Sequence, residues 1–181
     1  SLSEMGAKLL DLYLENPISD GIRQVEHNVL VPLMNSQHEY LETPMVSVFD
    51  LLTETNETVT LHEFKTSARK YSCLEVDLSL QATAYANAVY QLCGQIPVVE
   101  FVVLTKTKTP KIHRIETYRT EQQLLQFGDL VEMVESAITN NLFYPNPSPM
   151  NCSTCPYREP CKDWRPSHPK ELVQLNGSHA G

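Results

Sequence analysis

A short segment in the first half of the chain changes its side-chain chemistry along its length. Residues 59–65 have the sequence Val-Thr-Leu-His-Glu-Phe-Lys. In a strand, Val59 and Leu61 lie on one face, and Glu63 and Lys65 continue that face because side chains alternate with period two. Buried Glu and Lys are rare unless they are paired or bound to a metal ion. The segment therefore predicts a strand that runs out of the core into a polar, catalytic-looking site.

A second strand is predicted immediately upstream, at residues 45–52, which have the sequence Met-Val-Ser-Val-Phe-Asp-Leu-Leu. The polar run 53–58 between the two strands predicts a hairpin loop. A hairpin closed on this run brings Asp50 beside the partner segment that contains Glu63. Asp50, Glu63 and Lys65 are then expected to converge on one spot.

Hydrophobic periodicity predicts the remaining elements. We expect helices at residues 2–14, 80–93 and 120–140, strands at 22–33, 98–105 and 112–118, and a polar loop over the site at 67–78. The near-continuous apolar run 98–105 indicates a buried central strand, and 112–118 indicates an edge strand. This order predicts an α/β (α+β) fold with a mixed central β-sheet flanked by α-helices.

The order and spacing of these motifs resemble the PD-(D/E)xK nuclease superfamily. Asp50, a hairpin and then Glu63-Phe64-Lys65 resemble its metal-site motif, and Gln81 and Tyr85 resemble the Gln-x-x-x-Tyr helix of the RecB, AddB and Cas4 branch. The resemblance covers residues 24–164. It implies a restriction-endonuclease-like core with a Cys-rich C-terminal tail. We expect a nuclease domain at 1–164, which includes the Cys cluster at 152–161, and a polar tail at 165–181.

The resemblance implies a deoxyribonuclease that depends on Mg²⁺ or Mn²⁺. Hard divalent ions prefer oxygen ligands, which Asp50, Glu63 and the backbone carbonyl of Phe64 are expected to supply. Lys65 is expected to orient or polarise the attacking water, either with a lowered pKa or as a fixed positive charge. Exonuclease-like cleavage of DNA is the expected activity, and a helicase or a recombination or CRISPR protein is the expected partner.

Further residues have two readings each. Glu26 matches a glutamate that lies near the metal site in relatives, and a solvent-facing carboxylate on an edge strand fits equally well. Gln81 and Tyr85 share one helix face and are expected to steer DNA or Lys65, although such residues also form plain polar faces. Arg69 and Lys70 are expected to neutralise DNA phosphates, which adds affinity without sequence specificity.

Three cysteines lie close together near the C-terminus: Cys152, Cys155 and Cys161. Thiolates at such spacing bind zinc or an iron–sulfur cluster, and the spacing alone leaves the choice open. The resemblance to AddB- and Cas4-like nucleases implies a [4Fe–4S] cluster, with Zn²⁺ as the alternative, that fastens the tail to the fold. No cysteine precedes Cys73, which leaves four possibilities for the fourth ligand. It is Cys73, it is a residue of another type, it belongs to a segment upstream of this sequence, or the site is degenerate and has lost it. Cys93, at a helix end, is expected in the core.

Charge and one departure from the family pattern favour a second hypothesis. The net charge is −8, whereas proteins that bind nucleic acids are usually basic, and Gly6 is followed by Leu10 where the family often has Gly-x-x-x-His. A catalytically inactive module that binds DNA or a partner therefore remains as the alternative to a nuclease. The chain has no long apolar run, signal peptide or secreted cysteine pattern, so no membrane association and a cytoplasmic location are expected.

Overall fold

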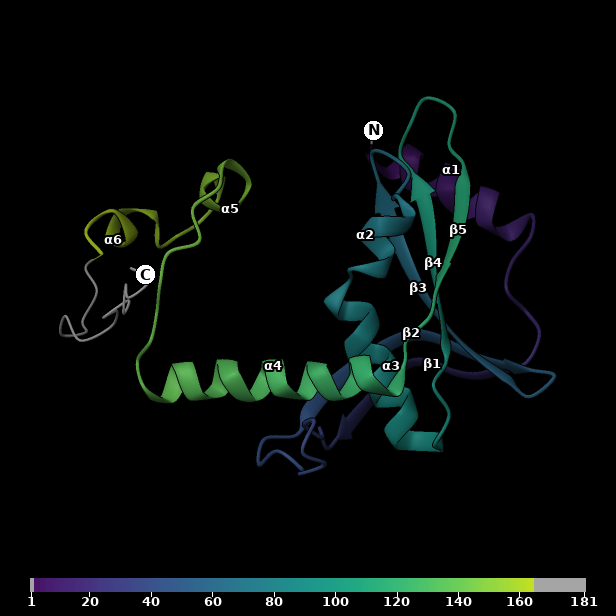
Figure 1. Ribbon diagram of the computed structural model, residues 1–181. Coiled ribbons are helices and arrows are strands. Elements are labelled where there is room, and N and C mark those ends of the chain that lie inside the picture. The colour runs from purple at the N-terminus through teal and green to yellow at the C-terminus, as the bar shows by residue number, and fades with distance from the viewer. Residues whose placement is uncertain (1, 165–181) are drawn as a thin grey trace, which may run out of the picture. The chain divides into compact units, whose positions relative to one another are not determined.

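The computed structural model describes residues 2–164, and the polar tail predicted at 165–181 lies outside them. Figure 1 shows the elements, which follow in the order α1 (Leu2–Leu14), β1 (Ile22–Val31), β2 (Met45–Thr55), β3 (Thr58–Ser67), α2 (Cys73–Asp77), α3 (Leu80–Cys93), β4 (Val98–Thr105), β5 (Ile112–Thr117), α4 (Glu121–Thr139), α5 (Pro149–Ser153) and α6 (Arg158–Lys162). Two compact units divide the chain, one ending at Val134 and one starting at Glu135. In the described part of the chain, no helix is long and apolar enough to span a bilayer.

The first unit contains a five-stranded sheet in the order β1-β2-β3-β4-β5. Neighbouring strands are antiparallel except β3 and β4, which are parallel and are joined by a crossover that contains α2 and α3. β4 is buried from Val99 to Thr105, and β5 is the edge strand. The predicted mixed sheet, its buried strand and its edge strand are therefore confirmed.

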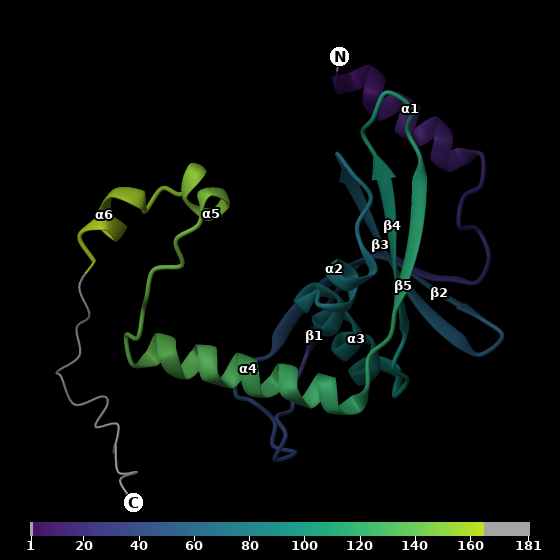
Figure 2. The same ribbon diagram turned by 45° about the horizontal axis from the view of Figure 1, so that its top comes forward.

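Helices cover both faces of this sheet (Figure 2). On β4, Phe101 and Val103 pack in the cluster that includes Ala86 and Val89 of α3. The alternate β4 residues Val102 and Leu104 form a second cluster with Leu9 of α1. Because side chains alternate across a strand, α1 and α3 lie on opposite faces of the sheet.

The hairpin between β2 and β3 is tighter than the sequence suggested. The polar run 53–58 predicted a loop, but the strands continue to a pairing of Thr55 with Thr58. Only Asn56 and Glu57 remain outside the ladder, with φ of 49° and 63°. Two successive residues in the left-handed region form a turn whose twist matches that of the flanking strands, so the ladder can extend to its edge.

Three further expectations about the crossover region are wrong. The loop predicted at residues 67–78 contains α2, which is capped by a reciprocal pair of hydrogen bonds between Ser72 and Glu75. The spacing of Leu80, Ala84, Ala88, Val89 and Leu92 predicts an Ala-rich apolar stripe on α3; Ala88 and Val89 are buried as expected, but Leu80 and Leu92 are 59% and 48% exposed. Ala82, Ala86 and Ala88 form most of the buried face, because their small side chains let the helix backbone approach the sheet closely. Cys93, expected in the core, is also exposed.

The helical glycines Gly6 and Gly128 give a matched pair of tests. A Cβ at Gly128 in α4 would lie 2.0 Å from the carbonyl oxygen of Met34, whereas a Cβ at Gly6 in α1 would meet nothing within 4 Å. Gly128→Ala is expected to destabilise the protein by roughly 1–3 kcal/mol, since the neighbouring atom is backbone. Gly6→Ala is expected to stabilise it by about 0.5–1 kcal/mol through helix propensity.

Urea unfolding of both glycine variants measures these changes in the free energy of unfolding. Equal stabilisation by the two alanines would show that α4 does not pack closely on the segment around Met34.

Candidate active site

The sheet forks next to the segment that the sequence singled out. The last pair between β2 and β3 is Leu51 with His62. Beyond it, β2 continues along β1 alone, while β3 continues along β4 as far as Ser67. At the fork, the backbone N–H of Phe64 donates to Oδ2 of Asp50 over 2.8 Å. A carboxylate from β2 thus replaces the strand partner that β3 loses, and this places Asp50 beside residues 63 and 64.

Glu63 is the buried centre of this arrangement, with 3% of its surface exposed. Lys65 forms an ion pair with Oε1 of Glu63. Gln81 Nε2, on α3, donates to the same Oε1 over 2.9 Å and to the hydroxyl of Tyr85 over 2.9 Å. The structure therefore brings together four of the residues expected in the site, from β3 and α3, and Asp50 adjoins them from β2.

The protonation of this group follows from its burial. Burial raises the pKa of Glu63, and the nearby charge of Asp50 raises it further, against the lowering effect of Lys65 and Gln81. Burial opposes the charge of Lys65, but the bond to Glu63 and its charge raise the pKa of Lys65 overall. Lys65 is therefore an ammonium group at neutral pH.

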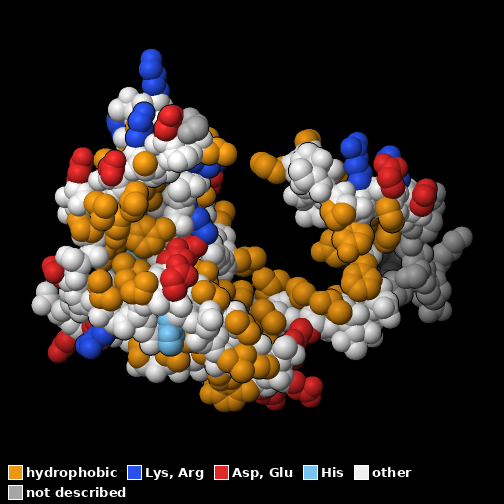
Figure 3. Space-filling model, turned by 180° about the vertical axis from the view of Figure 1, so that it is seen from behind, with side chains coloured by type: hydrophobic (Ala, Val, Ile, Leu, Met, Phe, Trp, Pro, Cys, Tyr) orange, Lys and Arg blue, Asp and Glu red, His pale blue; other side chains and the backbone are white. Residues whose placement is uncertain are grey.

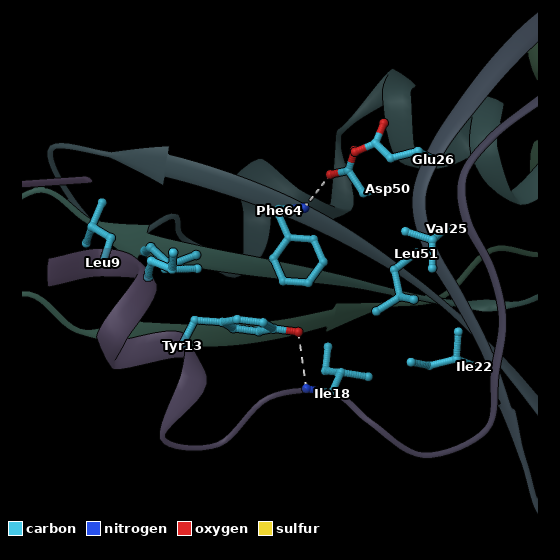
Figure 4. A pocket seen from close by; sticks show the side chains of 11 residues that line it. Leu9, Tyr13, Ile18, Ile22, Val25, Glu26, Asp50, Leu51 and Phe64 are labelled. Carbon is cyan, nitrogen blue, oxygen red and sulfur yellow. Dashed lines mark hydrogen bonds between the residues drawn. The ribbon is translucent and has the colours of Figure 1, made fainter. Parts of the chain in front are cut away.

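Glu26 of β1 lies opposite Asp50 of β2, because Val25 pairs with Leu51 and His27 pairs with Phe49. Its φ of 47° is in the left-handed region, which is uncommon for a residue other than glycine. Figure 4 shows its carboxylate beside that of Asp50, and the side chain is exposed. Glu26 is thus both solvent-facing and next to the proposed site, so the two readings of this residue describe one geometry.

Carboxylate oxygens from β2 and β3 adjoin at the fork, next to the backbone of Phe64. Glu63 Oε2 is buried and has no hydrogen-bond partner. Buried carboxylate oxygens without a partner are costly, and a cation relieves that cost. The N–H and C=O of a strand residue point to the same side, so the Phe64 carbonyl also faces the fork. Within residues 2–164 no three His, Cys, Asp or Glu side chains are grouped to hold a metal ion, so a bound cation would need the backbone oxygen or movement of Glu26.

Arg69 and Lys70 differ in how they are placed. Arg69 forms two hydrogen bonds to the Glu75 carboxylate, of 2.8 and 2.5 Å. This guanidinium, together with the hydrogen bonds from Ser72, lowers the pKa of Glu75 to about 2. Arg69 thus stabilises the start of α2, and a DNA phosphate would have to compete with Glu75 for the Arg69 guanidinium. Lys70 is exposed.

A buried polar network centred on His62 and Glu100 was not found from the sequence. His62 Nδ1 donates to Glu100 Oε2 over 2.8 Å, and His62 Nε2 lies 2.9 Å from the hydroxyl of Thr53. Arg114 Nη1 also donates to Glu100 Oε2 over 3.2 Å. The network joins β2, β3, β4 and β5 at the level of the fork. The available signal was Glu100, a carboxylate within an otherwise apolar strand.

This network predicts a loss of stability in acid. Burial alone would raise the pKa of Glu100, but the hydrogen bonds and charges of His62 and Arg114 lower it below 4.5. A carboxyl group whose pKa is lowered by folding stabilises the protein above the unfolded-state pKa, and that contribution is lost as pH falls through the folded-state pKa. Glu100→Gln is therefore expected to destabilise the protein near neutral pH.

The difference in unfolding free energy between wild type and Glu100→Gln should narrow as pH falls below about 4.5. Urea unfolding at a series of pH values measures it. A difference that stays constant across this range would exclude a charged, hydrogen-bonded Glu100.

The predicted cysteine ligands all lie in the second unit. Cys152 is in α5, Cys155 follows that helix, and Cys161 is in α6. All three are free thiols; Cys152 and Cys155 are half-buried and Cys161 is exposed. Cys73, one of the options for a fourth ligand, is an exposed residue at the start of α2 in the first unit. The metal cluster remains a prediction.

Comparison with known proteins identifies the same family as the motifs do. The model of the PD-(D/E)XK nuclease superfamily matches residues 2–162. A search of curated protein sequences finds no match. The fold is similar to that of SSO0001, with a TM-score of 0.51 and 14% identity over 89% of this chain and 71% of the other. A candidate exonuclease from Eubacterium rectale gives a TM-score of 0.47 and 17% identity over 98% of this chain and 65% of its own length.

Proposed function

Because the chain belongs to the PD-(D/E)XK nuclease superfamily, we propose that it is a metal-dependent deoxyribonuclease with exonuclease-like activity, related to the RecB and Cas4 branch. One observation carries the proposal. Glu63 is buried, with Lys65 and Gln81 on one oxygen and no partner on the other, where Asp50 from the neighbouring strand adjoins it. A purely structural carboxylate in the core would be expected to have both oxygens satisfied.

In this proposal Asp50, Glu63 and the Phe64 carbonyl hold Mg²⁺ or Mn²⁺, and Glu26 adds a ligand from β1. The ion supplies Lewis acidity toward the phosphate and lowers the pKa of a bound water. Asp50 is already fixed by the N–H of Phe64, so one of its oxygens is oriented before an ion arrives. Such preorganisation reduces the cost of ordering the site.

Lys65 is proposed to stabilise the negative charge that develops on the phosphate. Its bond to Glu63 raises its pKa, which favours a role as a positive charge over a role as a base. Part of the side chain is exposed, at 30%, so the ammonium group can reach a phosphate at the fork. A fixed charge directed at a developing charge is among the strongest catalytic contributions.

Gln81 and Tyr85 are proposed to orient the carboxylate. Gln81 donates to both Glu63 and the Tyr85 hydroxyl, so the amide is held between the two groups. Tyr85 packs edge-on against Phe49, with ring centroids 5.9 Å apart, and this fixes the hydroxyl. Both residues therefore position Glu63, and contact with DNA is proposed for the exposed Lys70.

For the second unit, we propose that Cys152, Cys155 and Cys161 hold a [4Fe–4S] cluster, with zinc as the alternative, in a structural role. A helicase or a recombination or CRISPR protein is the proposed partner. A non-catalytic module that binds DNA or a partner is the second candidate function. The net charge of −8 and the leucine at position 10 favour it.

Cleavage of end-labelled DNA tests the proposal. Wild-type protein is expected to degrade DNA in Mg²⁺ or Mn²⁺ and not in EDTA. Asp50→Asn is expected to lower the rate by at least about 10²-fold, because it removes an ion ligand. Asp11→Asn, an exposed aspartate of α1, is the matched control and should retain the wild-type rate. No cleavage with either metal ion, by folded protein with its cysteine site loaded, would favour the non-catalytic module.

A further inference from the structure

We propose that the apolar pocket next to the fork holds an unpaired nucleobase of the DNA strand whose phosphate lies at the metal site; this inference rests on the proposed nuclease function. The pocket has a volume of about 570 Å³. Pockets for small organic groups usually fall between about 300 and 1,000 Å³. Its walls come from α1, the segment after it, β1, β2, β3 and β4, all within the first unit.

The pocket and the proposed metal site share residues. Asp50 and Glu26 are among the residues that line the pocket. Phe64 also lines it, and the backbone N–H of Phe64 binds Asp50. Figure 4 shows the Phe64 ring projecting into the pocket while the two carboxylates lie at one end of it. A group in the pocket would therefore adjoin a phosphate bound at the fork.

The chemistry of the lining selects a base rather than a phosphate. Apart from Glu26 and Asp50, the lining side chains are aliphatic or aromatic, and no Lys, Arg or His belongs to the lining set. The pocket itself therefore offers no basic side chain to a phosphate, which the ion at its edge would bind instead. The apolar part of a nucleotide is its base, whose faces stack on aromatic and aliphatic side chains.

Two aromatic rings present apolar surface in a fixed orientation. Tyr13 and Phe64 pack edge to face, with centroids 5.3 Å apart and an angle of 89° between their planes. The Tyr13 hydroxyl accepts a hydrogen bond from the N–H of Ile18 over 3.2 Å, so its polar end is satisfied and its ring faces the pocket. Ordered rings lower the entropic cost of binding a flat group.

The pocket lies in a patch of exposed apolar surface. Figure 3 shows hydrophobic side chains gathered between α1 and the β1–β2 strands, with acidic side chains beside them. Leu10 and Val25, both in the pocket lining, are 57% and 61% exposed. Exposed apolar patches often mark binding sites. A base in a duplex has its faces stacked and its edges paired, so only a single-stranded or frayed end can offer one.

Leu10 and Leu14 provide a matched pair of variants. Both lie on α1 and are exposed to nearly the same degree, 57% and 58%, but only Leu10 lines the pocket. Glutamine is similar in size and helix propensity to leucine and carries no charge. Leu10→Gln therefore changes the pocket wall, and Leu14→Gln controls for a polar substitution on the same helix.

The experiment measures the fluorescence of 2-aminopurine in short DNA single strands that carry this base at successive positions. Binding is measured in Ca²⁺ instead of Mg²⁺ or Mn²⁺, so that the complex accumulates without cleavage. Wild type and Leu14→Gln are expected to change the fluorescence at one position near the end. Leu10→Gln should remove that change and weaken binding by roughly three- to tenfold. An abasic nucleotide at the same position should weaken wild type equally and should not weaken Leu10→Gln further.

Cleavage of the same strand in Mg²⁺ or Mn²⁺ separates this proposal from the nuclease itself. Two outcomes would overturn the base pocket and leave the nuclease in place, if the strand is cleaved. One is a fluorescence change that is the same at every 2-aminopurine position, and the other is equal binding of the strand by Leu10→Gln and Leu14→Gln. Position-dependent fluorescence without cleavage would support the pocket and contradict the nuclease. Equal affinity for single strand and blunt duplex would also overturn the pocket.

Discussion

Lys65→Ala is expected to lower the rate of metal-dependent DNA cleavage by about 10²- to 10³-fold, the usual effect of removing one preorganised charge from a transition state. The Lys65 ammonium is paired with Glu63, and this pairing raises the pKa of Lys65. Single-turnover cleavage of end-labelled DNA measures the chemical step directly.

Two controls make this result specific. Lys8→Ala removes a charge from an exposed position of α1 and is expected to leave the rate unchanged. Lys65→Arg keeps the charge but replaces a compact ammonium group with a planar guanidinium group, and should recover only part of the cleavage rate. Wild-type cleavage by Lys65→Ala, in protein with unaltered unfolding, would show that Lys65 serves only to pair with Glu63.

The largest effect on stability is expected from Arg119→Ala, with a loss of about 3 kcal/mol or more. Arg119 is 7% exposed and lies between β5 and α4. Its guanidinium donates to Thr83 Oγ1, Thr117 Oγ1, and the carbonyl oxygens of Val76, Ser79 and Tyr118. Alanine would leave a buried cavity and remove the donor that these five acceptors share, although the carbonyls of Val76 and Ser79 keep hydrogen bonds from the N–H groups of Ser79 and Thr83. The elements α2, α3 and β5 would lose their common partner.

Urea unfolding of Arg119→Ala measures this loss, and a surface arginine gives the comparison. Arg23 pairs with Glu54 over 3.2 Å, and their side chains are 60% and 38% exposed. Surface ion pairs contribute roughly 0–1 kcal/mol, so Arg23→Ala should change the unfolding free energy by no more than that. Similar losses for the two variants would show that the bonds of Arg119 are worth no more than a solvated contact.

Local pattern was sufficient for much of the fold and for the convergence of the site. The alternation in residues 59–65 and the neighbouring strand placed Asp50 beside Glu63 because a hairpin constrains two nearby segments. Gln81 and Tyr85 are four residues apart, so any helix carries them on one face. In the structure, Gln81 contacts both Glu63 and Tyr85.

Features that depend on distant partners were not predictable in this way. Glu100 contacts a histidine 38 positions away, and Arg119 contacts the carbonyl of Val76, 43 positions away. A buried charge is stable only because of such partners, and a single sequence does not show which segments meet. The exposure of Leu80 and Leu92 has the same origin, because the sheet contacts the alanine face of α3 rather than its leucines.

The fork of the sheet has a consequence for amide hydrogen exchange. The N–H of Phe64 is bonded to a carboxylate oxygen of Asp50 instead of to a backbone carbonyl of a neighbouring strand. Protection of this amide therefore depends on a side chain that a divalent cation would also recruit. The exchange rate of one backbone amide in the middle of a strand should thus respond to metal ions, while its neighbours on the β4 side should not.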